Sequence, residues 1–206
     1  MLAETVSKFG HLDSVILSAG IGVMGSIANC TLLDWPKQFS VNVFSLIGTL
    51  QIAIPHLRAS PNTGRIVLMS SGLGVMALPG LSAYCAAKAA VNSIARSLTL
   101  EEPDLVSLSV HPGIVDTAMI RELIETGADN GVHPATLKFF TDSLAAQKGL
   151  AKHPYPAVPA EVPARVFAWL AMNAPQELSG KVSSFYDDEI QKLMKEGAKA
   201  GTEAAA

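Results

Sequence analysis

Residues 64–91 read GRIVLMSSGLGVMALPGLSAYCAAKAAV, and this stretch decides the fold. It begins with a near-continuous apolar run over 65–70, which is typical of a strand buried on both faces of a parallel sheet. From Ala83 onward the pattern favours a helix that continues to Glu101. A buried strand followed by a long helix indicates an α/β fold.

The same stretch contains the candidate catalytic residues. Tyr84 and Lys88 are four residues apart, so on a helix they share one face. A cation near the phenol favours the phenolate, and we therefore expect Lys88 to lower the pKa of Tyr84 and prepare it for proton transfer. Ser71, at the end of the strand, is placed to hold a carbonyl or alcohol oxygen beside Tyr84. Taken alone, Tyr84 could equally be a surface aromatic and Lys88 a solvated charge.

Strand-like and helix-like runs alternate along the whole chain, which predicts a parallel sheet covered on both faces. The expected strands are 14–18, 65–70, 106–111 and 181–185. The expected helices are 2–9, 34–57, 83–101, 118–126, 134–147 and 159–172. We expect one domain over residues 1–206, with a tail over about 195–206 that frays.

These residues resemble the short-chain dehydrogenase/reductase family, whose hallmark is Tyr-x-x-x-Lys with an upstream serine. Asn42 falls where the family has a helical asparagine, and the Pro112-Gly113 pair resembles its Pro-Gly loop. The resemblance implies a Rossmann-like, doubly wound parallel sheet. It also implies an NAD(P)-dependent oxidoreductase that interconverts a carbonyl and an alcohol by hydride transfer. Its implied catalytic residues are Asn42, Ser71, Tyr84 and Lys88.

The family pattern also implies which residues contact the cofactor, which would be NAD or NADP. They are Ala19, Gly20, Tyr84, Lys88, Pro112, Gly113, Val115 and Thr117. Ala19 and Gly20 occupy the family's Asn-Asn-Ala-Gly position, although Leu17 and Ser18 replace the two asparagines. The glycines of residues 20–25 also fit G-x-G-x-x-G, but a dinucleotide loop should open directly into a helix, and here the next helix start is Asp34. His111 ends a strand before a proline, and we expect a structural role for it.

Members of the family usually begin with a strand, a glycine-rich phosphate-binding turn and a helix. Here residues 2–9 have the spacing of the helix that precedes the family's fourth strand, so we expect an N-terminally truncated domain without the first βαβαβ part. The region of about 118–158 follows the Pro-Gly loop, and we interpret it as a substrate lid. An ordinary pair of surface helices is the alternative.

The composition of the chain limits the classes of partner that we expect it to bind. The 206 residues carry a net charge of −3 and are 49% hydrophobic, which gives no case for nucleic acid and indicates a well-buried core. No metal-ligand spacing is present, and two cysteines form no disulfide framework. No apolar run reaches the roughly 18 residues of a membrane span, so we expect a cytoplasmic protein without a membrane partner.

The small-molecule partner expected from the family is a carbonyl or alcohol substrate. The family also commonly pairs the helices that correspond to 34–57 and 83–101, which implies a homodimer or homotetramer when the N-terminus is complete. The alternative function is a catalytically inactive fragment, or an interaction protein, that has lost cofactor binding.

Overall fold

A computed structural model describes the backbone of residues 2–203 and the side chains of residues 2–198. Four parallel strands form a single sheet in the order β1-β2-β3-β4. They are β1 (Ser14–Leu17), β2 (Arg65–Met69), β3 (Val106–His111) and β4 (Val182–Ser184). The α/β fold with a parallel, Rossmann-like sheet that the sequence predicts is therefore confirmed.

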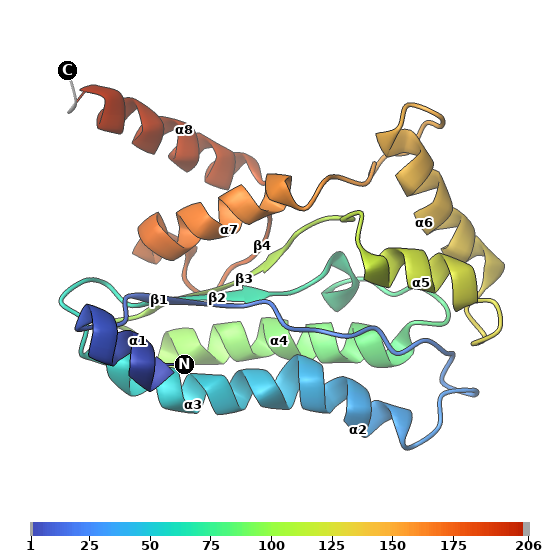
Figure 1. Cartoon of the computed structure of the whole chain (residues 1–206), viewed down its shortest axis with the longest axis horizontal. Coiled ribbons are helices and arrows are strands. Elements are labelled where there is room, and N and C mark those ends of the chain that lie inside the picture. The colour runs from blue at the N-terminus through green and yellow to red at the C-terminus, as the bar shows by residue number, and fades with distance from the viewer. Residues whose placement is uncertain (1, 204–206) are drawn as a thin grey trace.

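One face of the sheet is covered by α1, α3 and α4, which lie below it in Figure 1. The bounds are α1 (Leu2–Phe9), α2 (Asp34–Phe39), α3 (Ser45–Arg58) and α4 (Ser82–Glu101). Ile66 and Leu68 of β2 point into this layer and have no exposed surface, as expected for alternate residues of a strand.

The opposite face is covered by α7 (Glu161–Asn173), with α8 (Asp188–Glu203) beside it (Figure 1). Val67 of β2 and Leu108 of β3 pack here against Phe167 and Leu170 of α7, all 3% exposed or less. Near-continuous apolar strands therefore have helices on both faces, which explains the apolar run that opens residues 64–91.

Two further helices lie beyond the C-terminal ends of the strands, away from both layers (Figure 1). They are α5 (Ala118–Thr126) and α6 (Pro134–Gln147), which together fill most of the segment interpreted as a lid. His133 donates its backbone N–H to the Pro79 carbonyl oxygen, and the Thr136 hydroxyl donates to the same oxygen at 2.9 Å. The α5–α6 pair is thereby fixed to the loop that precedes α4.

Two elements differ from the sequence expectation. The expected single helix over 34–57 is interrupted by a π-helical segment, Ser40–Phe44, because the side chains of this segment bind main-chain groups outside the helix, as described below. The segment expected to fray is helical as far as Glu203, since α8 packs Ile190 and Leu193 against the α7 layer. Residues 204–206 of that expected tail lie outside the described part of the chain.

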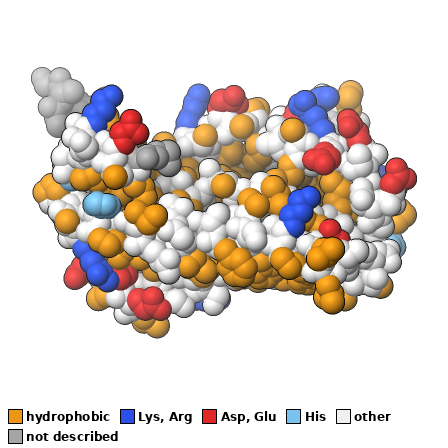
Figure 2. Space-filling model, turned by 60° about the horizontal axis from the view of Figure 1, so that its bottom comes forward, with side chains coloured by type: hydrophobic (Ala, Val, Ile, Leu, Met, Phe, Trp, Pro, Cys, Tyr) orange, Lys and Arg blue, Asp and Glu red, His pale blue; other side chains and the backbone are white. Residues whose placement is uncertain are grey.

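The α2–α3 stretch, Asp34–Arg58, contains an 18-residue window with a mean hydropathy of 1.3 and is long and apolar enough to cross a membrane by length and composition alone. Leu46, Leu50 and Leu57 of α3 are buried against the sheet, which accounts for this apolar character as that of a core helix. Its outward side exposes Phe44 and Ile52, which are 58% and 59% exposed. Figure 2 brings the α3 and α4 layer forward and shows hydrophobic side chains in a band with few charged ones among them.

Candidate active site

The loop that follows β2 is held tightly against α4. A Cβ atom at Gly74 would come within 2.7 Å of Asn92 Nδ2 and 2.9 Å of the Lys88 carbonyl oxygen, so only glycine permits this approach. Ser71 begins the short 3₁₀ turn Gly72–Gly74, and its hydroxyl oxygen accepts a hydrogen bond of 3.2 Å from the Leu73 amide. The backbone thus fixes the Ser71 hydroxyl in place.

A buried polar network lies beneath this loop and was not foreseen from the sequence. Asn92 Oδ1 accepts hydrogen bonds from the hydroxyls of Ser70 (2.5 Å) and Ser109 (2.9 Å), and its amide donates to the Gly74 carbonyl oxygen at 3.2 Å. The network joins the ends of β2 and β3 to α4. The Ser70 side chain therefore faces α4.

Tyr84 is half-buried in the first turns of α4, and its hydroxyl makes a hydrogen bond with the side chain of Ser71. Burial raises the pKa of Tyr84 above its ordinary value; the Ser71 hydrogen bond acts in the lowering direction, and Cys85 adds a small raising effect. The expectation that Lys88 lowers the pKa of Tyr84 is wrong, because the free-energy cost of burying the phenolate is larger than the stabilisation that a nearby cation gives it. Tyr84 is therefore a protonated phenol at neutral pH.

Lys88 lies one turn further along α4 and is only 4% exposed. Its ammonium donates a hydrogen bond of 2.8 Å to the Met69 carbonyl oxygen at the end of β2, and it lies 5.7 Å from the centroid of the Tyr84 ring. Burial lowers the pKa of Lys88 to about 8. The spacing of four residues does bring Lys88 over the tyrosine, as the sequence predicts.

Asn42 lies in the π-helical segment, with 2% of its surface exposed. Its side-chain oxygen accepts a hydrogen bond of 2.8 Å from the Ile21 amide, and its side-chain amide donates to the Ile21 carbonyl oxygen at 2.9 Å. Gln38, which is fully buried, donates to the same carbonyl and accepts from the Val23 amide at 2.7 Å. Gln38 was missed in the sequence, although it precedes Asn42 by four residues and so shares its helix face.

Residues 20–25 therefore form an extended segment held by two side chains, and no helix follows them until Asp34. A Cβ atom at Gly20 would lie 3.5 Å from Asn42 Oδ1 and 3.7 Å from Lys88 Nζ. The structure thus brings together Gly20, Asn42 and Lys88, with Ala19 adjacent to Gly20. The phosphate-loop interpretation of these glycines, already disfavoured by the sequence, has no helix N-terminus to support it.

The Pro112-Gly113 loop follows β3 and faces the same region. Gly113 has a φ of +71°, and a Cβ atom there would meet the Phe185 ring at 2.7 Å, so the loop needs glycine. Val115 pairs with Val158 in an isolated parallel bridge, which ties the loop to the end of the lid segment. Thr117 is exposed and immediately precedes α5.

A cavity of about 490 Å³ lies over Ser71 and Tyr84. Its walls are mostly apolar and come from α4, the Pro-Gly loop, α5, α6, the segment 154–158 and the residues after β4. Its aromatic and imidazole side chains are Tyr84, His111, Phe139, Phe140, Tyr155, Phe185 and Tyr186. Residues of α5 and α6 thus line the space above the catalytic candidates.

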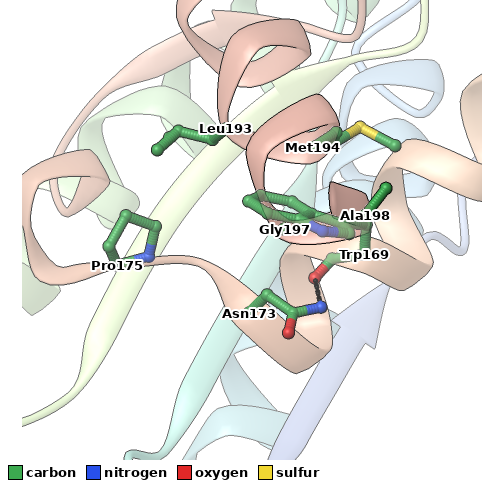
Figure 3. A pocket seen from close by; sticks show the side chains of 7 residues that line it. All are labelled: Trp169, Asn173, Pro175, Leu193, Met194, Gly197 and Ala198. Carbon is green, nitrogen blue, oxygen red and sulfur yellow. Dashed lines mark hydrogen bonds between the residues drawn. The ribbon is translucent and has the colours of Figure 1, made fainter. Parts of the chain in front are cut away.

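A second hollow, of about 480 Å³, lies between α7 and α8 (Figure 3). It is lined by Trp169, Asn173, Pro175, Leu193, Met194, Gly197 and Ala198. None of these side chains ionises, and Asn173 donates its amide to the Trp169 carbonyl oxygen at 3.0 Å. Among the described residues there is also no cluster of side chains suited to a metal ion. The cavity over Tyr84 is therefore the candidate active site.

A Rossmann-like sheet with a serine after β2, and a tyrosine and a lysine four residues apart on α4, is the arrangement of a dinucleotide-dependent oxidoreductase. The chain belongs to the short-chain dehydrogenase family, whose model matches residues 1–128. It is 37% identical to an uncharacterised oxidoreductase of Schizosaccharomyces pombe over 87% of this chain and 69% of that protein. It is 31% identical to a benzil reductase ((S)-benzoin forming) of Saccharomyces cerevisiae over 92% of this chain and 72% of that protein.

A solved structure agrees with this assignment. The crystal structure of a short-chain dehydrogenase/reductase from Saccharomyces cerevisiae aligns with a TM-score of 0.81 and 29% identity, over 92% of this chain and 72% of that one. The protein is accordingly an oxidoreductase that uses a nicotinamide cofactor.

The residues present fit the nicotinamide end of such a cofactor. An ammonium carries three donors, and the Met69 carbonyl oxygen takes one from Lys88, which leaves donors for ribose hydroxyls. Gly20 leaves the space beside Lys88 free of a side chain. The cavity is within the size range of small-molecule sites and adjoins Gly113.

Proposed function

We propose that this protein reduces a carbonyl compound to an alcohol, with Tyr84 as the proton donor. The observation that carries the proposal is the hydrogen bond between Tyr84 and Ser71, which both line a mostly apolar cavity. The raised pKa of Tyr84 supports reduction over oxidation, because a phenol that holds its proton is ready to act as a general acid.

Each of the candidate catalytic residues has a defined role in this proposal. The Ser71 and Tyr84 hydroxyls donate hydrogen bonds to the substrate carbonyl oxygen and orient it. The reduced cofactor, when bound, supplies the hydride that adds to the carbonyl carbon. Tyr84 gives its proton to that oxygen, so that the C=O double bond becomes an alcohol and the phenolate forms next to the Lys88 ammonium.

Lys88 then has two tasks. Its ammonium stabilises the transient phenolate electrostatically, and its remaining donors hold the cofactor ribose together with the Gly20 region. Asn42 fixes the backbone of Ile21, next to Gly20. In this proposal Asn42 also relays protons between solvent and Lys88. Ala19, Pro112, Gly113, Val115 and Thr117 complete the proposed cofactor contacts.

The proposed substrate is a mid-sized aromatic carbonyl compound. Two groups of aromatic side chains border the cavity: Phe139 and Phe140, with ring centroids 5.2 Å apart, and Phe185 and Tyr186, 5.0 Å apart. Flat apolar rings favour stacked or edge-on contact with such walls. The benzil reductase relative acts on a diaryl compound, which supports the same class for this protein.

The test is an assay of the full-length gene product with NADH and NADPH, each offered with benzil and with simple aliphatic ketones. We expect oxidation of one of the two cofactors that depends on the aromatic carbonyl. Absence of turnover with all carbonyl compounds, together with alcohol oxidation in the presence of NAD or NADP, would contradict the proposed direction. The alternative of an inactive fragment or interaction protein is not favoured, because the family and the intact Ser71, Tyr84 and Lys88 set indicate an enzyme.

Three finer expectations accompany this proposal. We propose a homodimer or homotetramer formed through the outer faces of α3 and α4, and a cytoplasmic location. We propose that residues 118–158 act as a lid over the substrate, because α5 and α6 line the cavity.

A further inference from the structure

His111 is the one imidazole that lines the cavity over Tyr84. Five polar side chains line the cavity within the described chain: Ser71, Tyr84, His111, Tyr155 and Tyr186. Tyr155 and Tyr186 are 52% and 49% exposed, so they lie at the rim. His111 lies deeper, with its ring edge-on to Tyr186 at 5.8 Å between centroids.

The hydrogen bonding of the His111 ring is incomplete. Its Nδ1 atom is enclosed by protein and has no partner among the described residues. A buried N–H without an acceptor is rarer in proteins than an unpaired acceptor, so the tautomer with the proton on Nε2 is favoured. Burial lowers the pKa of His111, while Asp187 acts in the opposite direction, so the ring is neutral at neutral pH. His111 therefore offers an Nε2–H donor to a molecule in the cavity.

His111 and Ser71 lie at the ends of neighbouring strands, and both line the cavity. β2 and β3 are parallel neighbours with Met69 opposite Val110, so Ser70 follows opposite His111 and Ser71 is the next residue. The Ser70 amide bonds to the Val110 carbonyl oxygen at 2.8 Å, which keeps the two strand ends together beyond the regular ladder.

We propose that His111 is a specificity residue that donates a hydrogen bond from Nε2 to a second substrate oxygen, next to the carbonyl held by Ser71 and Tyr84. The preferred substrates are then 1,2-dicarbonyl compounds over monoketones of the same shape. The inference rests on the proposed carbonyl reduction and names the substrate class of that site. A site that hydrogen-bonds a substrate oxygen discriminates against the analogue that lacks it, because a polar group is then left unpaired.

The experiment compares benzil with deoxybenzoin, which has the same two phenyl rings but a methylene group in place of one carbonyl. The quantity measured is the ratio of kcat/KM for the two ketones in the full-length protein, its His111→Phe variant and its His111→Gln variant. Phenylalanine keeps a ring of similar size but removes the donor, whereas the glutamine amide retains an N–H near the Nε2 position. His56→Phe, on α3 and outside the cavity, is the matched control.

We expect His111→Phe to reduce the preference for benzil about tenfold, the value of one neutral hydrogen bond, mainly through KM for benzil. His111→Gln should restore part of that preference, and His56→Phe should leave it unchanged. Equal loss on both ketones in His111→Phe, or a rise in KM for the cofactor alone, would overturn the inference while carbonyl reduction stands. Absence of activity on both ketones in the wild-type protein would instead refute the proposed function.

Discussion

The Lys88 ammonium donates a hydrogen bond of 2.8 Å to the Met69 carbonyl oxygen, while the Tyr84 ring centroid lies 5.7 Å from the same nitrogen. The cation is therefore anchored to the end of β2 and lies over the tyrosine ring without bonding its hydroxyl. This arrangement fixes the position of the positive charge. The Tyr84 hydroxyl makes its hydrogen bond with the Ser71 side chain instead.

The first prediction concerns the pH dependence of stability. The folded pKa of Lys88 is about 8, below the value of 10.5 for a free lysine, so the unfolded chain binds more protons between these pH values. Stability should therefore rise with pH through this window, by up to about 3 kcal/mol in total, and Lys88→Met should remove the rise.

The measurement is urea unfolding from about pH 7 to about pH 9.5, which stops short of the ionisation of Tyr84. Tyr84 contributes with the opposite sign, since its raised pKa makes stability fall with pH above its ordinary value of 10.0. Lys195→Met, on the exposed side of α8, serves as a control and should keep the wild-type dependence. If the free energy of unfolding of Lys88→Met has the same pH dependence as that of the wild type, the lowered pKa assigned to the buried Lys88 ammonium is refuted.

The second prediction concerns the proton donor. Tyr84→Phe should reduce kcat by roughly 10²–10⁴-fold, the usual contribution of a general acid, with little change in cofactor affinity. Tyr155→Phe removes a phenol hydroxyl from the rim of the same cavity and should cost far less. Near-normal turnover in Tyr84→Phe, with a melting curve like that of the wild type, would exclude the assigned role.

The third prediction concerns the segment beside the cofactor site. Gln38 holds both the Ile21 carbonyl and the Val23 amide from a fully buried position. Gln38→Ala should leave these groups unpaired and lower the free energy of unfolding by about 1–3 kcal/mol. Gln51→Ala, on the exposed face of α3, should change it by less than about 0.5 kcal/mol. Equal effects of the two substitutions in chemical denaturation would contradict the bracing role.

The fourth prediction concerns self-association. The outward faces of the α2–α3 stretch and α4 combine exposed Phe44 and Ile52 with small residues such as Ala90 and Ser97, which permit close helix approach. Ile52→Lys should shift the protein toward monomer in size-exclusion chromatography with light scattering, because it places a charge in an apolar contact. Leu150→Lys, at a more exposed site within the lid segment, should not. A wild-type protein that remains monomeric at high concentration would rule out this interface.

The local sequence determined much of the protein. The apolar runs and their alternation with helical spacing predict the four parallel strands of the described chain and six helices, which cover α1 to α7 but not α8, because burial on both faces of a sheet leaves little freedom in composition. The spacing of Tyr84 and Lys88 predicts that they share a helix face, since that follows from helix geometry alone. Gly113 was similarly recognisable in its loop, where a positive φ excludes most other residues.

Only the tertiary structure decided the electrostatics and the polar contacts of the site. The pKa of Tyr84 depends on how deeply it is buried, a property that spacing cannot give, so the sequence suggested the wrong direction. Gln38, Asn92 and His111 act through partners that are 15 or more residues away, or through an unpaired nitrogen inside a shared cavity. Such contacts form only when strand ends, loops and helices from distant parts of the chain meet. The periodicity of the sequence therefore predicts the fold, whereas the polar contacts of the site depend on tertiary packing.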